Sequence, residues 1–243
     1  MSDGTLTYVG NELELFAGAS NWKRYVARHL LPFITGRVLE VGAGIGSNIT
    51  PLINATVQDW LALEPDSALA GEIERRLQEN TLPSQCRVQV GTIADIPPRQ
   101  AFDTILYIDV LEHIEDDRGE VARAATLLRP GGRIVVLGPA HQFLYSPFDQ
   151  SVGHFRRYNL MSLERLIPDG CVVEAGFMLD SVGFFASLAN RFVLRSAMPT
   201  KAQIASWDRM IVPLSRLVDP LSRYRFGKSA VMVWRPVDQH HVP

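Results

Sequence analysis

Seven short apolar runs are spaced along this chain, and helix-like segments separate most of them. The runs lie at residues 37–41, 60–63, 87–90, 104–108, 133–137, 171–175 and 230–234. The sequence between them favours helices near 47–53, 67–78 and 118–128, the last of which ends before Pro130-Gly131-Gly132. Strands that alternate with helices form βαβ units, whose parallel strands are covered on both faces. The pattern therefore predicts an α/β fold with a mostly parallel, seven-stranded sheet.

Two helical segments accompany this core. Residues 1–36 are amphipathic and end at Pro32 and Gly36. Their apolar side chains at helical spacing are Trp22, Tyr25, Val26, Leu30 and Leu31. Residues 181–228 precede the last run, are expected to form two or three helices, and carry a net charge of +6 against −8 for the rest of the chain. We expect a single domain, with a core at 37–180, this helical insert, and a last strand and tail at 229–243.

Composition excludes several classes of protein. The 243 residues are 47% hydrophobic and 21% charged, which excludes global disorder and allows one sizeable core. A net charge of −2 argues against general nucleic-acid binding. Cys86 and Cys171 are too few for a disulfide framework and are expected to be buried thiols. The first residues lack the basic start of a signal peptide, and no apolar stretch reaches about 18 residues, so we expect a cytoplasmic protein.

A glycine-rich turn, Glu40-Val41-Gly42-Ala43-Gly44-Ile45-Gly46, follows the first run and precedes a helix. Glycines let the backbone turn tightly and approach a ligand, and the helix start offers N–H groups to a carboxylate or phosphate. The alternative is a tight turn with no ligand. A nicotinamide-dependent oxidoreductase would carry its third glycine or small residue one place later, after the pattern G-x-G-x-x-G. The early Gly46, together with the acid Glu40, argues against that class.

A second acid, Glu64, ends the next run, 22 residues after Gly42. A carboxylate at this place can accept hydrogen bonds from both hydroxyls of a ribose. The alternative is a solvated acid at the end of a strand. The distance from the glycine-rich turn favours a nucleoside ligand.

Together these residues resemble the class I S-adenosylmethionine-dependent methyltransferases, of the type 11/12, small-molecule branch. Glu40–Gly46 is similar to their motif E/D-x-G-x-G-x-G, and Ala62–Asp66 looks like their ribose-binding segment. Asp109–Asp116, which contains V-L-E-H, and the turn at Arg129–Gly132 are also similar to the family. The resemblance covers residues 20–140, and the N/D-P-P-Y/F/W motif of adenine-N6 and glutamine-N5 methyltransferases is missing.

The resemblance implies a Rossmann-like methyltransferase fold and S-adenosyl-L-methionine as cofactor. Thr92 stands where the family commonly has Asp or Asn, so the adenine contact stays open between Thr92 and Ile93. The implied cofactor-binding residues are Glu40, Gly42, Ala43, Gly44, Gly46, Glu64, Pro65, Thr92, Ile93 and Asp109.

The segment from Gly138 to Tyr158 follows the fifth run and is rich in aromatic, histidine and arginine residues. Its pattern S-P-x-D-x-x-x-G-H-x-R-R-Y resembles a signature of a broad bacterial branch of the family. Long loops at the ligand edge of a sheet often carry function. The expected substrate-binding residues are Tyr145, Arg156, Arg157 and Tyr158. The alternative is a loop fixed to the sheet by pairing between arginine and Asp149.

Three histidines, His113, His141 and His154, lie where the ligand edge is expected. A hydroxyl acceptor needs a base near neutral pKa, which favours histidine as the catalytic residue. Each of the three has a structural role as its alternative. No cluster of histidine and acidic residues has metal-ligand spacing along the sequence, so we expect no metal site.

The sequence favours methyl transfer to a small molecule, most simply at oxygen, with a sugar, lipid or natural product as acceptor. The alternative is a non-catalytic protein of a membrane surface or a partner complex on the same scaffold. The basic insert at 181–228 could cover the acceptor pocket of an enzyme or lie on an anionic membrane surface. Its apolar stripe, which could be core, a lid over the acceptor or a membrane contact, is Phe184, Phe185, Leu188, Phe192 and Val193.

Overall fold

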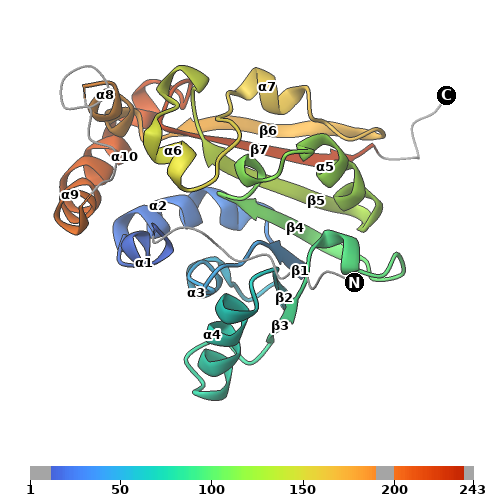
Figure 1. Cartoon of the computed structure of the whole chain (residues 1–243). Coiled ribbons are helices and arrows are strands. Elements are labelled where there is room, and N and C mark those ends of the chain that lie inside the picture. The colour runs from blue at the N-terminus through green and yellow to red at the C-terminus, as the bar shows by residue number, and fades with distance from the viewer. Residues whose placement is uncertain (1–11, 190–199, 238–243) are drawn as a thin grey trace.

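A computed structural model describes residues 12–189 and 200–237, and these residues form one seven-stranded sheet (Figure 1). Its order is β3-β2-β1-β4-β5-β7-β6, and only the pairs of β7 with β5 and β6 are antiparallel. The strands are β1 (Gly36–Val41), β2 (Val57–Glu64), β3 (Cys86–Val90), β4 (Phe102–Ile108), β5 (Leu128–Pro139), β6 (Cys171–Leu179) and β7 (Ser229–Pro236). This confirms the predicted fold class.

Helices surround the sheet and connect its strands. The α-helices are α1 (Glu12–Ala17), α2 (Ser20–Leu30), α3 (Ile49–Leu52), α4 (Ser67–Gln78), α5 (Asp117–Thr126), α6 (Pro147–Ser151), α7 (Leu160–Glu164), α8 (Ser181–Ala189), α9 (Lys201–Ser206) and α10 (Val212–Leu221). Short 3₁₀ turns are η1 (Leu31–Phe33), η2 (Ile93–Asp95), η3 (Leu111–His113) and η4 (Gln142–Leu144), and η6 (Trp207–Ile211) is a π-helix. No helix of the described residues is long and apolar enough to cross a membrane.

Two apolar cores lie on opposite faces of the sheet, because successive side chains of a strand point to opposite sides. In β1, Leu39 and Val41 join the core under α5 and α7. Val38 points to the other face and joins the core under α2, α3 and α4. Buried apolar side chains fill both cores. A ligand site is therefore expected at the strand ends, where polar residues lie.

Three details differ from the sequence prediction. The helix expected at 47–53 is only the four-residue α3, because the glycine-rich turn continues to Asn48. The Pro130–Gly132 turn lies inside β5, where pairing with β4 skips from Leu128 to Arg133. Cys86 is buried as predicted, whereas Cys171 is partly exposed because it begins the edge strand β6.

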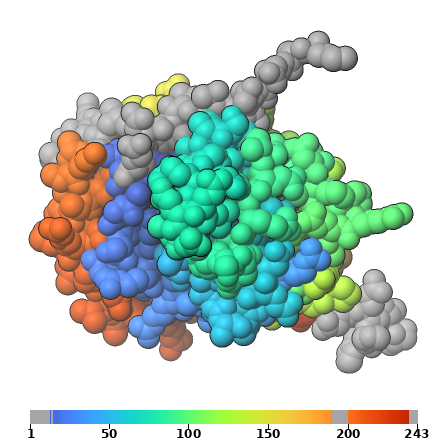
Figure 2. All heavy atoms as spheres, turned by 90° about the horizontal axis from the view of Figure 1, so that it is seen from below, coloured from blue at the N-terminus to red at the C-terminus, as the bar shows by residue number. Residues whose placement is uncertain are grey.

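The insert packs against the N-terminal helices, as the neighbouring blue and orange surfaces in Figure 2 show. Asp208 of η6 accepts hydrogen bonds from the backbone N–H groups of Asn21 (3.2 Å) and Trp22 (2.8 Å), which begin α2. The Tyr25 hydroxyl donates to Asp219 of α10 across 2.6 Å. Phe192 and Val193 of the predicted stripe lie outside the described residues.

Candidate functional site

A cavity of about 780 Å³ opens at the carboxyl ends of the parallel strands. Ligands of open α/β sheets bind at this edge, and the volume lies toward the upper end of the roughly 300–1,000 Å³ of ligand pockets. The glycine-rich turn after β1, the end of β2 and the residues after β4 form part of its wall. Helices α1 and α2 add apolar side chains to it.

The glycine-rich turn has a backbone that only glycine adopts easily. Gly42, Gly44 and Gly46 have φ angles of 65°, 57° and 71°. A Cβ atom on Gly42 would lie 2.7 Å from a methyl carbon of Val110, which follows β4. The N–H groups of Gly42 and Ala43 donate to the carbonyl oxygen of Leu63 at 2.8 and 3.1 Å. The turn is therefore held close against the ends of β2 and β4.

Glu64 holds this turn in place from the end of β2. Its Oε2 accepts the backbone N–H of Gly44 at 2.7 Å, and its Oε1 accepts that of Asp66 at 3.0 Å. Burial raises the pKa of Glu64, and the two N–H donors oppose this shift. Glu64 also lines the cavity, and each carboxylate oxygen keeps a lone pair for a further donor. A buried acid beside glycine backbone that lines the cavity fits the ribose and amino-acid parts of the expected cofactor.

Two of the predicted cofactor residues lie outside the cavity lining and support the turn instead. Glu40 is buried, and its carboxylate accepts hydrogen bonds from Asn48 Nδ2 (3.3 Å) and Trp60 Nε1 (3.1 Å). Burial raises the pKa of Glu40 to about 7. A Cβ atom on Gly46 would lie 3.1 Å from Ile49 and 3.2 Å from Ile73, so this glycine allows close packing of the turn on α3 and α4.

The other predicted cofactor residues line the cavity: Gly42, Ala43, Gly44, Glu64, Pro65, Thr92, Ile93 and Asp109. Thr92 directly precedes η2, and its N–H and hydroxyl both donate to the Asp95 carboxylate at 2.8 and 3.0 Å. Asp109 directly follows β4 with a φ of 55°. Desolvation raises the pKa of Asp109 to about 6, and the charges of His154 and Lys228 oppose the shift. Their roles toward the cofactor stay predictions.

Two of the three predicted catalytic histidines lie together in the cavity wall. The rings of His113, from η3, and His154, from the loop after α6, have centroids 4.6 Å apart. Nδ1 of His154 lies 2.9 Å from Oδ1 of Asp149. His141 is not among the lining residues, and its Nε2 lies 3.0 Å from the carbonyl oxygen of Gly227.

The loop from 138 to 158 is fixed by polar contacts within it and with Asp117 of α5. Its role in substrate binding stays a prediction. Arg157 makes a bidentate ion pair with the fully buried Asp149, at 2.8 and 2.9 Å. Arg156 and the Tyr158 hydroxyl both contact Oδ2 of Asp117, at 2.7 and 2.9 Å.

Tyr145, the fourth predicted substrate residue, donates its hydroxyl to the carbonyl oxygen of His154 at 2.6 Å. Of the four residues predicted to bind substrate, only Arg157 lines the cavity.

Several lining residues were not predicted from the sequence. Phe16 and Trp22 of the N-terminal helices and Trp207 of the insert give the cavity an aromatic wall. The ammonium group of Lys228 lies 5.0 Å above the Trp207 ring, and burial lowers its pKa. The amphipathic spacing within residues 1–36 indicated a helix with one apolar face, but it did not indicate that this face borders the ligand edge.

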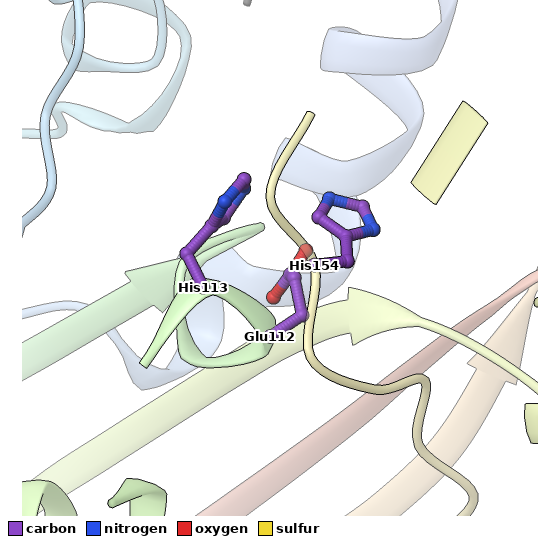
Figure 3. Close-up of side chains that lie close together, drawn as sticks. All are labelled: Glu112, His113 and His154. Carbon is purple, nitrogen blue, oxygen red and sulfur yellow. The ribbon is translucent and has the colours of Figure 1, made fainter. Parts of the chain in front are cut away.

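Glu112, beside His113 in η3, was also not predicted as a site residue. Its side chain is fully buried, and no other residue of the described parts of the chain donates a hydrogen bond to its carboxylate. Burial raises the pKa of Glu112 well above its usual value, and the charge of Asp109 adds to this. One ligand atom each of Glu112, His113 and His154 lies within 4.8 Å of the others (Figure 3). The fold thus brings together a histidine and acid cluster that no spacing along the sequence indicated. The expectation of no metal site stays a prediction.

Known proteins share both the sequence pattern and the fold of this chain. Residues 39–134 match the family model described as a methyltransferase domain. The chain is 29% identical over 220 residues, 88% of its length, to a Salinispora arenicola protein described as a probable non-canonical nonribosomal peptide synthetase, CymA. It is 30% identical over 187 residues, 74% of its length, to the ajmaline N-methyltransferase of Rauvolfia serpentina. It spans 3% and 58% of these two relatives.

Solved structures extend the likeness of the fold over nearly the whole chain. A geranyl diphosphate methyltransferase in complex with S-adenosylmethionine aligns with a TM-score of 0.64 and 16% identity. The alignment covers 97% of this chain and 92% of that enzyme. The low identity means that the likeness concerns the fold.

Proposed function

This chain belongs to the class I S-adenosylmethionine-dependent methyltransferases, and from that premise we propose that it methylates an oxygen atom of a small-molecule acceptor. The cofactor, S-adenosylmethionine, supplies an activated sulfonium methyl group when bound. Its transfer to a hydroxyl oxygen leaves a neutral thioether and releases one proton. The chain itself has to align the acceptor, exclude water and stabilise the oxygen that loses the proton.

One observation carries this proposal: a single cavity contains both Glu64 and the histidines His113 and His154. Glu64 ends β2 and His113 follows β4, and β1 is the one strand between β2 and β4. Two strand spacings are roughly 10 Å, so a cofactor and an acceptor have room side by side. We propose that Glu64 and the glycine-rich turn hold the cofactor, while His113 and His154 face the acceptor oxygen. His141 is left out of this role, because it contacts the Gly227 backbone outside the cavity lining.

The aromatic lining supports an acceptor with an apolar body, of lipid or natural-product type. Phe16, Trp22, Phe148, Phe155 and Trp207 all border the cavity. Aromatic side chains contribute large apolar contact areas and make pockets selective by shape. The ammonium group of Lys228 also borders the cavity, which supports an acceptor that carries a negative group.

Calorimetric titration with S-adenosylhomocysteine, with NAD as the control ligand, tests the cofactor part. We expect one molecule of S-adenosylhomocysteine to bind per chain and no binding of NAD. Absence of S-adenosylhomocysteine binding would contradict the proposal. Acceptor screening then follows by counting S-adenosylhomocysteine released, starting with anionic and apolar hydroxyl compounds.

A second proposal concerns the insert, which presents exposed apolar and basic side chains together. Met210, Leu214, Leu217 and Leu221 are 52–85% exposed. Arg209, Arg216, Arg223 and Arg225 are exposed on the same segment. Basic amphipathic helices with such a surface lie on anionic membranes. We propose that this surface brings the enzyme to a membrane and so to apolar acceptors.

A further inference from the structure

Within the described residues, no other residue donates a hydrogen bond to the buried carboxylate of Glu112, which points to a ligand at this place. Both of its oxygens are inaccessible to bulk solvent. A buried polar group without a partner costs about 1–3 kcal/mol, and more when it is charged. Figure 3 shows the Glu112 carboxylate next to the side chains of His113 and His154. We propose that Glu112, His113 and His154 bind a divalent transition-metal ion that holds the acceptor oxygen.

The three side chains have the chemistry of metal ligands. Two imidazoles and one carboxylate suit ions such as Mn²⁺, Fe²⁺ or Zn²⁺. The ligand atoms lie within 4.8 Å of one another. Ligands at about 2.1 Å from an ion are roughly 3–4 Å apart, so a small side-chain rotation closes the set. A negative ligand and a positive ion together also remove the cost of the unpaired carboxylate.

Outer contacts orient both imidazoles, as is usual in metal sites. Oδ1 of Asp149 lies 2.9 Å from Nδ1 of His154 and is a hydrogen-bond acceptor, which leaves Nε2 of His154 as the metal-binding atom. His113 has a hydrogen bond with the backbone of Val152. Asp149 is itself fixed by Arg157 and Ser146, so the orientation of His154 does not depend on solvent.

The ion would act on the acceptor, and this rests on the proposed function. The three ligands border the cavity, so open positions of the ion face its interior. A hydroxyl bound to a divalent ion loses its proton more easily, as metal-bound water does. The oxygen then forms its bond to the methyl carbon as the carbon–sulfur bond breaks, and the proton passes to solvent. The ion keeps its oxidation state throughout.

Metal binding is measured on protein stripped with a chelator, by calorimetric titration with MnCl₂ and ZnCl₂ and by elemental analysis. We expect one ion per chain. Glu112→Gln and His154→Gln should each weaken binding by at least 10-fold, and Asp149→Asn, which removes the charge that orients His154 and pairs with Arg157, by about 10- to 100-fold. His29→Gln is the matched control, because His29 lies among Tyr25, Phe177 and Tyr224 away from the cluster. It should bind metal as the wild type does.

The proposal is overturned if the stripped protein binds no Mn²⁺ or Zn²⁺, or if the cluster variants bind as tightly as the wild type. Thermal unfolding of each variant shows whether it folds, and His113→Asn replaces any variant that does not. Titration with S-adenosylhomocysteine separates the two proposals. Binding of S-adenosylhomocysteine without metal would leave the proposed function and remove the metal site. If the protein binds metal but not S-adenosylhomocysteine, the metal site is kept and the proposed function is contradicted.

Discussion

The backbone N–H of Gly44 donates to Oε2 of Glu64 across 2.7 Å, which joins the glycine-rich turn after β1 to the end of β2. The other oxygen of the same carboxylate accepts the N–H of Asp66, the residue before α4. One buried acid therefore fixes the two segments on which cofactor binding is proposed to depend. Its remaining lone pairs face the cavity, where the ribose is expected.

Glu64→Gln should weaken S-adenosylhomocysteine binding by about 10- to 100-fold, because hydrogen bonds to a charged group contribute about 1.5–3 kcal/mol. Calorimetric titration measures the change in Kd. Glu74→Gln, on the exposed face of α4, is the matched control and should leave the Kd unchanged. An unchanged Kd for folded Glu64→Gln would remove Glu64 from the ribose site.

Gly42→Ala should both destabilise the protein and reduce cofactor binding. Its φ of 65° is unfavourable for alanine, and the new methyl group would lie 2.7 Å from Val110. We expect a loss of about 1–3 kcal/mol in the free energy of unfolding, measured with urea. Gly71→Ala is the opposite control. No atom lies within 4 Å of its new Cβ in helix α4, so it should stabilise by about 0.5–1 kcal/mol. Equal effects of the two variants would contradict this account.

Local signals in the sequence predicted much of this fold. Helix α4 begins at Ser67 and ends at Gln78, as predicted, because the Asp66 carboxylate accepts the N–H groups of Ala68 and Leu69 and fixes the start. The strands were found because their residues form short apolar runs in a doubly covered sheet. The glycine-rich turn resembles a cofactor-binding motif of the methyltransferases, which correctly predicted that the end of β1 borders the cavity.

The remaining parts of the site depend on contacts between distant residues. His154 follows His113 by 41 positions, and only the folded loop brings it to Glu112. Asn21 and Asp208 are 187 positions apart, and their contact joins α2 to η6. Trp22 of α2 and Trp207 of η6 both line the cavity. No spacing along the chain encodes such pairs, whereas the neighbouring Asp149 and Arg157 could be considered as a pair from the sequence.

Glu40 gives the protein a pH-dependent stability. Burial raises the pKa of Glu40 to about 7 in the folded state, above the ordinary 4.5 of the unfolded chain. Between these values the folded state binds more protons, so this contribution to stability is present at low pH and is lost as the pH rises toward 7. The shift corresponds to about 3 kcal/mol.

The Glu40→Gln variant has no carboxyl group to titrate at this position, so it lacks this pH dependence. Urea unfolding at pH 5, 6 and 7.5 should show the wild type losing about 2 kcal/mol relative to this variant as the pH rises across this range. Two pH profiles that run parallel would show that Glu40 does not titrate as proposed.

The membrane proposal predicts salt-sensitive sedimentation with vesicles that contain anionic phosphatidylglycerol, and none with neutral phosphatidylcholine. Changing Arg216, Arg223 and Arg225 together to glutamate should reduce binding by at least 100-fold, because each basic residue contributes about 1 kcal/mol near such a surface. Arg99→Glu, exposed in the segment after η2, is the control and should keep most of the binding. Absence of sedimentation with anionic vesicles would exclude the membrane contact.

Removal of Arg157 from its ion pair with Asp149 should destabilise the protein far more than removal of an arginine from a comparable, partly exposed pair. Asp149 is completely buried, and Arg157 binds both of its oxygens. Arg157→Met leaves the buried carboxylate without its main partner, which should cost about 3–5 kcal/mol. The bidentate pair of Arg133 and Glu174 has side chains 27% and 24% exposed, so Arg133→Met should cost no more than about 1 kcal/mol.

Urea unfolding of both variants at pH 7 makes the comparison, since each replaces one bidentate arginine by the same apolar residue. The same pair also fixes the loop that carries His154. Arg157→Met should therefore increase proteolysis in residues 141–158, which limited digestion detects, whereas Arg133→Met should not. Equal losses of stability would mean that water or Ser146 satisfies Asp149 without the arginine. The loop would then be held by its aromatic packing and by the contacts of Arg156 with Asp117.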